Sequence, residues 1–77
     1  MEKTNETFIL TTLDALFAVL DMRVNCRVYK LDEHGDFELI KEGSVYEIVT
    51  DTDFYTEHRA NNVGGISICL GTISVQI

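Results

Sequence analysis

Hydrophobic residues recur along the chain with two different periods, and the first one indicates a helix. Four apolar residues fall at positions i, i+3, i+4 and i+7: Leu13, Leu16, Phe17 and Leu20. Side chains with this spacing share one face of an α-helix. Thr11 and Asp14 form a T-x-x-D arrangement, which places a capping hydroxyl and an acid at the positive end of that helix. We therefore predict an amphipathic helix over residues 12–21, too short to be stable without packing on a sheet.

A period of two residues, typical of strands, dominates much of the remaining chain. Residues 24–31 alternate between apolar and polar side chains, a polar segment with a glycine follows, and residues 37–41 return as a second strand. Residues 66–69 and 73–77 repeat this arrangement around another glycine. Two β-hairpins are therefore expected, one in the middle of the chain and one at its end.

The alternation breaks within the second strand. Phe37 and Leu39 have one parity and Ile40 the other, which predicts either a bulge or a strand with apolar side chains on both faces. Residues 42–44 then mark a further bulge or break before a short apolar group, which consists of Val45, Tyr46, Ile48 and Val49.

Residues 50–59 have the features of a second, short helix. Thr50 and Asp51 are candidate caps, and acids precede His58 and Arg59, the order that the helix dipole favours. The Asn and Gly residues that follow are typical of a helix end. The fold class predicted from these elements is α+β, as a single domain over residues 1–77. It is a two-layer sandwich with one amphipathic helix on an antiparallel sheet of about four strands, in the order α-β-β-(α)-β-β.

Acidic residues are distributed unevenly along the chain. Its 77 residues contain 13 Asp and Glu against 6 Lys and Arg, a net charge of −7. Residues 31–58 contain nine acids and one base, residues 1–30 are balanced, and residues 59–77 contain only Arg59. Such a field repels nucleic acid and anionic membranes, and attracts a basic nucleic-acid channel on another protein.

We therefore predict that the acids of the middle segment form a partner-binding rim. The candidate residues are Asp32, Glu33, Asp36, Glu38, Glu47, Asp51, Asp53 and Glu57. The alternative interpretation is a solvated face that keeps the protein soluble.

The sequence contains no glycine-rich phosphate loop, no H-E-x-x-H motif and no constellation that predicts nucleophilic catalysis, so we expect no enzymatic activity and no organic cofactor. A zinc site stays open as a hypothesis, because both histidines are flanked by acids. Its candidate ligands are His34, Asp36 and His58, with Cys26 or Cys69 as a source of sulfur.

The two cysteines are too few for a disulfide-framed secreted scaffold. Cys26 shares a strand face with apolar residues and Cys69 does not, so we expect a buried thiol, a more exposed thiol and no disulfide between them. The chain has no apolar run long enough for a membrane span and its amino terminus lacks a secretory signal, which predicts a cytoplasmic protein.

A second interaction surface is predicted on the sheet face away from the first helix. Tyr29, Ile40 and Cys69 would make that face apolar, and one short helix cannot cover both faces. The alternative function is therefore a small structural or regulatory domain that forms a homodimer through this face, with or without stabilisation by zinc, and has no connection to nucleic acid.

The order of the sequence segments along the chain is also informative. The leucine stripe of residues 13–20 is followed by VNCRVY at 24–29, EGSVYEI at 42–48 and ISVQI at 73–77. Over residues 11–77 this pattern resembles the short acidic proteins of bacterial phages and mobile elements, of which the anti-CRISPR proteins are the best-known group. The resemblance implies an inhibitor of a host defence system that binds a CRISPR effector nuclease or another nucleic-acid-handling protein. It lies in size, acidity and architecture, and it assigns no site residue.

Overall fold

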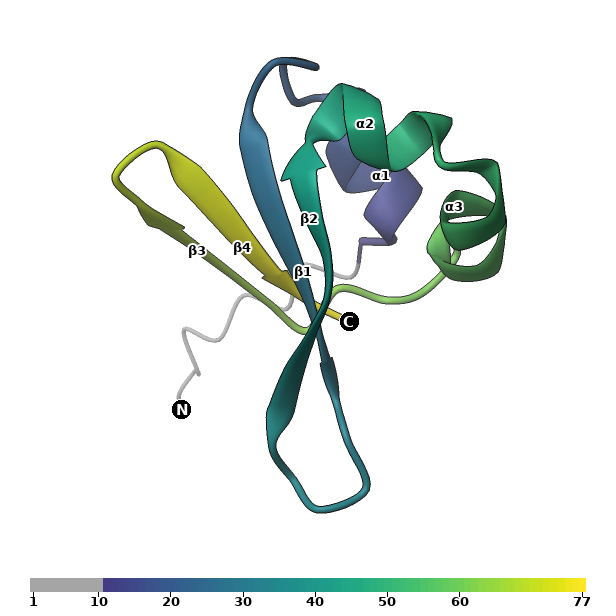
Figure 1. The fold of residues 1–77 in the computed structure, drawn as a ribbon, viewed down its shortest axis with the longest axis vertical. Helices are drawn as coiled ribbons and strands as arrows, with labels where there is room; N and C mark the ends of the chain where they lie inside the picture. The colour runs from purple at the N-terminus through teal and green to yellow at the C-terminus, as the bar shows by residue number, and fades with distance from the viewer. Residues whose placement is uncertain (1–10) are drawn as a thin grey trace, which may run out of the picture.

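The computed structural model describes residues 11–77, which form a four-stranded sheet and three short helices (Figure 1). Along the chain the elements are α1 (Leu13–Ala18), β1 (Asn25–Leu31), β2 (Phe37–Ser44), α2 (Val45–Thr50), α3 (Thr52–His58), β3 (Gly65–Cys69) and β4 (Thr72–Gln76). The predicted α+β class is confirmed. The short stretch at Thr7–Leu10 that could add a strand lies outside the described residues.

The strand order in the sheet is β2-β1-β4-β3. Both predicted hairpins are present, and their strands pair antiparallel. The expectation of an entirely antiparallel sheet is wrong, because β1 and β4 lie side by side and pair parallel. The chain reaches the sheet again through α2 and α3, enters at the outer strand β3 and turns back, so that β4 runs in the direction of β1 (Figure 1).

The core lies between the two central strands and the helices. Its fully or nearly buried hydrophobic residues come from β1 and β4 on one side and from α1 and α2 on the other: Leu13, Phe17, Cys26, Val28, Val45, Ile48, Ile73 and Val75. Because directly paired residues point to the same face of a sheet, the pairs Cys26–Ile73 and Val28–Val75 present one apolar surface to the helices. The helices thus form the second layer of the predicted sandwich.

Helix α1 begins one residue later than the T-x-x-D spacing predicts and is shorter. Its N-cap is Thr12, whose hydroxyl oxygen accepts from the Ala15 amide. The helix ends at Ala18 rather than at residue 21. The Val19 amide donates to the Leu16 carbonyl at 3.2 Å, a bond from residue i to i−3 that tightens the last turn.

Helix α2 was not predicted, and it replaces the short apolar group that followed the expected break. Ser44 and Glu47 form a capping box: the Ser44 hydroxyl accepts from the Glu47 amide, and the Glu47 carboxylate accepts from the Ser44 amide at 2.8 Å. Helix α3 agrees with the predicted helix over 50–59 except at its start, because residue 50 ends α2 and Asp51 caps α3.

The irregularity predicted in the second strand is a β-bulge. Val28 of β1 pairs with Lys41, whereas the next residue, Tyr29, pairs with Leu39. Ile40 is the extra residue, and its side chain packs against the core. As a result Lys41 lies on the helix side of β2, while Leu39 lies on the opposite face.

Candidate protein interaction surface

The β1–β2 hairpin extends well beyond the ends of β3 and β4 and away from the helices (Figure 1). Its loop is held by Asp32, whose carboxylate accepts from the amides of His34 and Asp36 at 2.8 and 2.9 Å. The Asp32 amide also donates to the carbonyl of Asp36 at 2.7 Å. Gly35 supplies the positive φ of 87° that the turn requires. The loop is therefore an ordered turn in which one of the predicted rim residues, Asp32, has a structural role.

The outer face of this hairpin carries an apolar patch. Its members pair across the two strands, Tyr29 with Leu39 and Leu31 with Phe37, and we call these four residues the hairpin patch. Leu31 and Phe37 are both 51 % exposed and Leu39 is 44 % exposed. Phe37 and Leu39 lie on the same face as Tyr29 and Leu31 of β1 because the bulge at Ile40 shifts the parity of β2.

Acids lie between the residues of the hairpin patch along the chain. Glu33 and Asp36 are exposed in the loop, and Glu38 is exposed on β2, paired in register with Lys30. Within residues 30–38, Lys30 is opposed by four carboxylates, so the tip has an apolar centre in a negative field.

Two other predicted rim residues, Glu47 and Asp51, stabilise helix ends. Glu47 belongs to the capping box of α2. The Asp51 carboxylate caps α3 and forms an ion pair with Lys41, whose ammonium group also lies 5.8 Å from the centre of the Phe54 ring. The hydrogen bond from Lys41 lowers the pKa of Asp51, and the backbone amide of Phe54 acts in the same direction. These carboxylates are engaged within the fold.

The last two predicted acids, Asp53 and Glu57, lie on α3, in its first turn and near its end. Figure 1 places α3 beside the upper part of the sheet, away from the hairpin loop. The acids of residues 31–58 therefore do not form one continuous rim. They divide into a group at the hairpin tip and a group along α2 and α3, while Glu42 of β2 pairs with Arg27.

The candidate zinc ligands are distributed over the same two regions. His34 and Asp36 are in the hairpin loop, and His58 is in the last turn of α3. Among residues 11–77, no three His, Cys, Asp or Glu side chains gather as a metal site requires. His58 is only 8 % exposed, packs on Phe54 with ring centres 4.6 Å apart, and keeps its Nδ1 without a hydrogen-bond partner. It is part of the packing beneath α3.

The cysteines lie as predicted. Cys26 is buried on β1, Cys69 is exposed on β3, and they form no disulfide. Burial raises the pKa of the Cys26 thiol to about 11, which keeps it protonated and unreactive at neutral pH.

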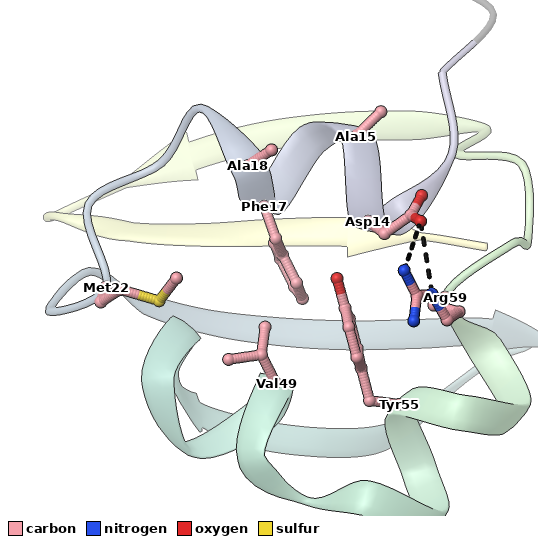
Figure 2. Close-up of a pocket in the computed structure, with 8 residues that line it drawn as sticks. All are labelled: Asp14, Ala15, Phe17, Ala18, Met22, Val49, Tyr55 and Arg59. Atoms are coloured by element: carbon pink, nitrogen blue, oxygen red, sulfur yellow. Dashed lines mark hydrogen bonds and ion pairs between the residues drawn. The ribbon is translucent and has the colours of Figure 1, made fainter.

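A shallow apolar groove separates α1 from α2 and α3 (Figure 2). Its volume is about 460 Å³, and Phe17, Met22 and Val49 line it together with Tyr55, whose ring stacks on Phe17 at 6.3 Å. One end is closed by Arg59, which pairs with the Asp14 carboxylate at 3.3 Å and lies 5.5 Å from the Tyr55 ring. Burial raises the pKa of the Tyr55 hydroxyl, and the Asp14 charge raises it further. Because its cation and its carboxylate already neutralise each other, the groove offers packing rather than a charged site.

The second face of the sheet is less apolar than the sequence suggests. Tyr29 and Cys69 lie on it, but the prediction for Ile40 is wrong because the bulge turns that side chain to the core. Away from the hairpin patch, the face carries serines, threonine and a pair between Arg27 and Glu42, whose Nε and Oε2 are 2.7 Å apart. Apart from Cys69, its apolar residues are those of the hairpin patch.

The hairpin patch is the surface that sequence reasoning missed, although Phe37 and Leu39 already showed the parity that produces it. A search of protein families, curated proteins and solved structures finds no match to this chain. Over residues 11–77, each helix is too short and too polar to cross a bilayer.

Proposed function

We propose that this chain is a small, non-enzymatic interaction protein that binds a basic, nucleic-acid-binding surface of another protein through the tip of its β1–β2 hairpin. The single observation that carries this proposal is the combination, at one projecting tip, of the hairpin patch with exposed acids. An apolar centre with a polar or charged border is the usual composition of a protein interface.

The shape of the tip supports a partner with a groove. The hairpin projects along the longest axis of the molecule, which extends 45 Å, so its loop reaches into a recess that the body would not enter (Figure 1). The turn is ordered by Asp32 and Gly35, and a preformed loop loses less entropy on binding than a mobile one.

The charge at the tip supports a basic partner and disfavours self-association there. Two copies that met through the hairpin patch would bring their loop carboxylates together, and like charges at an interface are repulsive. A groove lined by Lys and Arg, such as one that holds nucleic acid, offers complementary charge instead. The finer proposal follows from the resemblance: an inhibitor of the anti-CRISPR type, carried by a phage or mobile element, that occupies the nucleic-acid channel of an effector nuclease in the host cytoplasm.

The test is a pull-down by the purified protein from a panel of reconstituted CRISPR effector complexes, at low and at high salt, together with an assay of DNA cleavage by each effector. Two variants separate the contributions of charge and apolar contact. Glu33→Gln/Asp36→Asn/Glu38→Gln neutralises the tip and leaves Asp32, which holds the turn. Phe37→Ser removes the largest exposed side chain of the hairpin patch.

The matched control is Asp53→Asn/Glu57→Gln, which neutralises acids on α3 without touching the hairpin. The proposal expects capture and inhibition that weaken steeply with salt, are lost in both hairpin variants and persist in the α3 control. Capture that depends on α3 and not on the hairpin would overturn the assigned surface. Absence of capture and inhibition across the panel would overturn the anti-CRISPR function.

A further inference from the structure

The outer strand β3 presents an uncharged and strongly apolar edge. Residues 60–77 contain no Asp, Glu, Lys or Arg. Two isoleucines of β3 point to the face that carries the core, because Ile66 pairs with Val75 and Ile68 with Ile73, yet Ile68 is 71 % exposed and Ile66 is 44 % exposed. The helices cover the central strands and stop short of this edge (Figure 1).

The backbone of this edge is open over the described part of the chain. Within residues 11–77, β3 pairs with β4 and with no second strand. Alternate amide and carbonyl groups of an outer strand point away from the sheet and are free to pair with another strand. Natural sheets protect such edges with charges, prolines or bulges, and β3 has a regular register and neither a charge nor a proline.

The sequence of β3 is nearly symmetric about its centre. Read as Gly-Ile-Ser-Ile-Cys over 65–69, it has Ser67 in the middle, isoleucines on either side and small residues at both ends. A two-fold axis at Ser67 would pair Ile66 with Ile68 of a second copy, and Gly65 with Cys69, in an antiparallel ladder. The two isoleucines then meet each other and the small residues meet at the ends, so this register is sterically compatible with an isologous interface.

We infer that β3 is the contact through which two copies of this chain associate, antiparallel about Ser67, to form a continuous eight-stranded sheet. Four isoleucines, two from each copy, cover one another on the face that carries the core. Directly opposed β-branched side chains are stabilising cross-strand pairs.

The distribution of charge favours a second copy in this position. The acids of residues 31–58 lie on β2, its hairpin loop and the adjoining helices, and β2 is separated from β3 by two strands. At about 4.8 Å per strand, the β2 edges of the two copies would lie several Debye lengths apart at physiological salt. The two net negative chains therefore meet at their neutral edges, and both acidic hairpins stay free.

The first test is a disulfide cross-link in the full chain. In the variant Ser67→Cys/Cys69→Ser, the two introduced thiols face each other across the axis, because opposed Cα atoms in antiparallel strands are roughly 4.5–5.5 Å apart, within disulfide range. Mild oxidation is expected to give a covalent dimer. The wild type, oxidised in parallel, is the control. Its Cys69 faces Gly65 of the other copy and is expected to stay monomeric on a non-reducing gel.

The second test is the mass in solution by sedimentation equilibrium, from micromolar to millimolar protein. The wild type is expected to pass from one chain to two as concentration rises, and Ile68→Lys is expected to raise the dissociation constant about tenfold or more. Thr72→Lys is the control, because it adds the same charge to β4 and not to the β3 edge. It is expected to associate as the wild type does. Ile68 is exposed, so the variant is expected to keep the wild-type circular dichroism spectrum.

Cross-linking through wild-type Cys69 in place of residue 67 would overturn the register. A wild-type chain that stays monomeric to millimolar concentration would overturn the association itself, as would a dimer that Ile68→Lys leaves intact. These outcomes are independent of the hairpin variants, which leave β3 unchanged.

Discussion

The two outer strands of the sheet, β2 and β3, are opposites in charge and regularity. β2 carries Glu38, Lys41 and Glu42 and is bulged at Ile40, whereas β3 is uncharged and regular. Charges and bulges are the means by which sheet edges avoid pairing with other sheets. Over residues 11–77, the sheet therefore has one edge that charges and a bulge protect, at β2, and one edge, at β3, whose outward backbone groups pair with no second strand.

The edges also differ in how they are joined to the core. β2 continues without a loop into α2, which buries Val45 and Ile48 completely. β3 contributes two isoleucines that remain partly or largely exposed, Ile66 at 44 % and Ile68 at 71 %. The same substitution should therefore have very different consequences on the two sides of the sheet.

The largest expected difference comes from a matched pair of isoleucines. Ile48→Ala leaves a cavity beneath α2 and should lower the free energy of unfolding by about 2–5 kcal/mol, whereas Ile68→Ala, at 71 % exposure, should lower it by less than about 1 kcal/mol. Urea unfolding at low protein concentration, where the chain is monomeric, measures both. Similar losses for the two variants would show that β3 is packed as tightly as α2.

A matched pair of serines should give a smaller difference. Ser44→Ala removes the hydroxyl that accepts from the Glu47 amide and should cost about 1 kcal/mol. Ser67→Ala, in the middle of β3, removes an exposed hydroxyl and should stay within about 0.5 kcal/mol of the wild type. The same unfolding experiment measures them. An unchanged Ser44→Ala variant would mean that the capping box is dispensable for the junction of β2 and α2.

The capping box also shows where sequence analysis fell short. Ser44 and Glu47 stand three residues apart just before an apolar run, which is a recognised start signal for a helix. The signal was in the sequence, and α2 was missed because the preceding glycine suggested a break in a strand. The helices at 13–18 and 52–58 and both hairpins were predictable because their signals are local, in periodicity, caps and turns.

The parallel pairing of β1 with β4 had no such local signal. It joins residues 25–29 to 72–76, and each strand alternates in the same way whether its neighbour is parallel or antiparallel. The sequence predicts only part of the hairpin patch. The parity of Phe37, Leu39 and Ile40 indicated a bulge, but which residues it turns outward depends on the register against β1.

A still smaller effect is expected in the turns of the two hairpins. In the β3–β4 turn, Leu70 has a φ of 50° and is 98 % exposed, whereas Gly35 supplies the positive φ in the β1–β2 loop. A leucine in the left-handed region costs roughly 1–2 kcal/mol, and asparagine tolerates it better. Leu70→Asn should therefore raise the free energy of unfolding by about 0.5–1 kcal/mol.

Leu70→Ala is the control for this prediction, since alanine keeps the backbone strain while it removes the exposed side chain. It should show no gain in thermal or urea unfolding. A gain equal to that of Leu70→Asn would attribute the effect to the exposed leucine and not to the backbone.

The smallest change is expected on acidification, from the ion pair between Asp51 and Lys41 of β2. Lys41 lowers the pKa of Asp51 in the fold. A carboxyl with a lowered pKa stabilises the folded state at every pH above its unfolded value, near about 4, and this contribution is lost as the pH falls through the folded value. Stability should therefore be unchanged by Asp51 between about pH 7 and pH 5 and decline below about pH 4.

The variant Asp51→Asn isolates this contribution, because asparagine still caps α3 but carries no charge to titrate. Its urea midpoint should fall less than that of the wild type below about pH 4, and the decline that remains belongs to carboxyls such as Asp14, whose pKa is also lowered. The segment over residues 60–77 has no acidic side chain, so β3 contributes none of it. An identical acid profile for Asp51→Asn and wild type would show that the pair of Lys41 and Asp51 is too well solvated to couple protonation to folding.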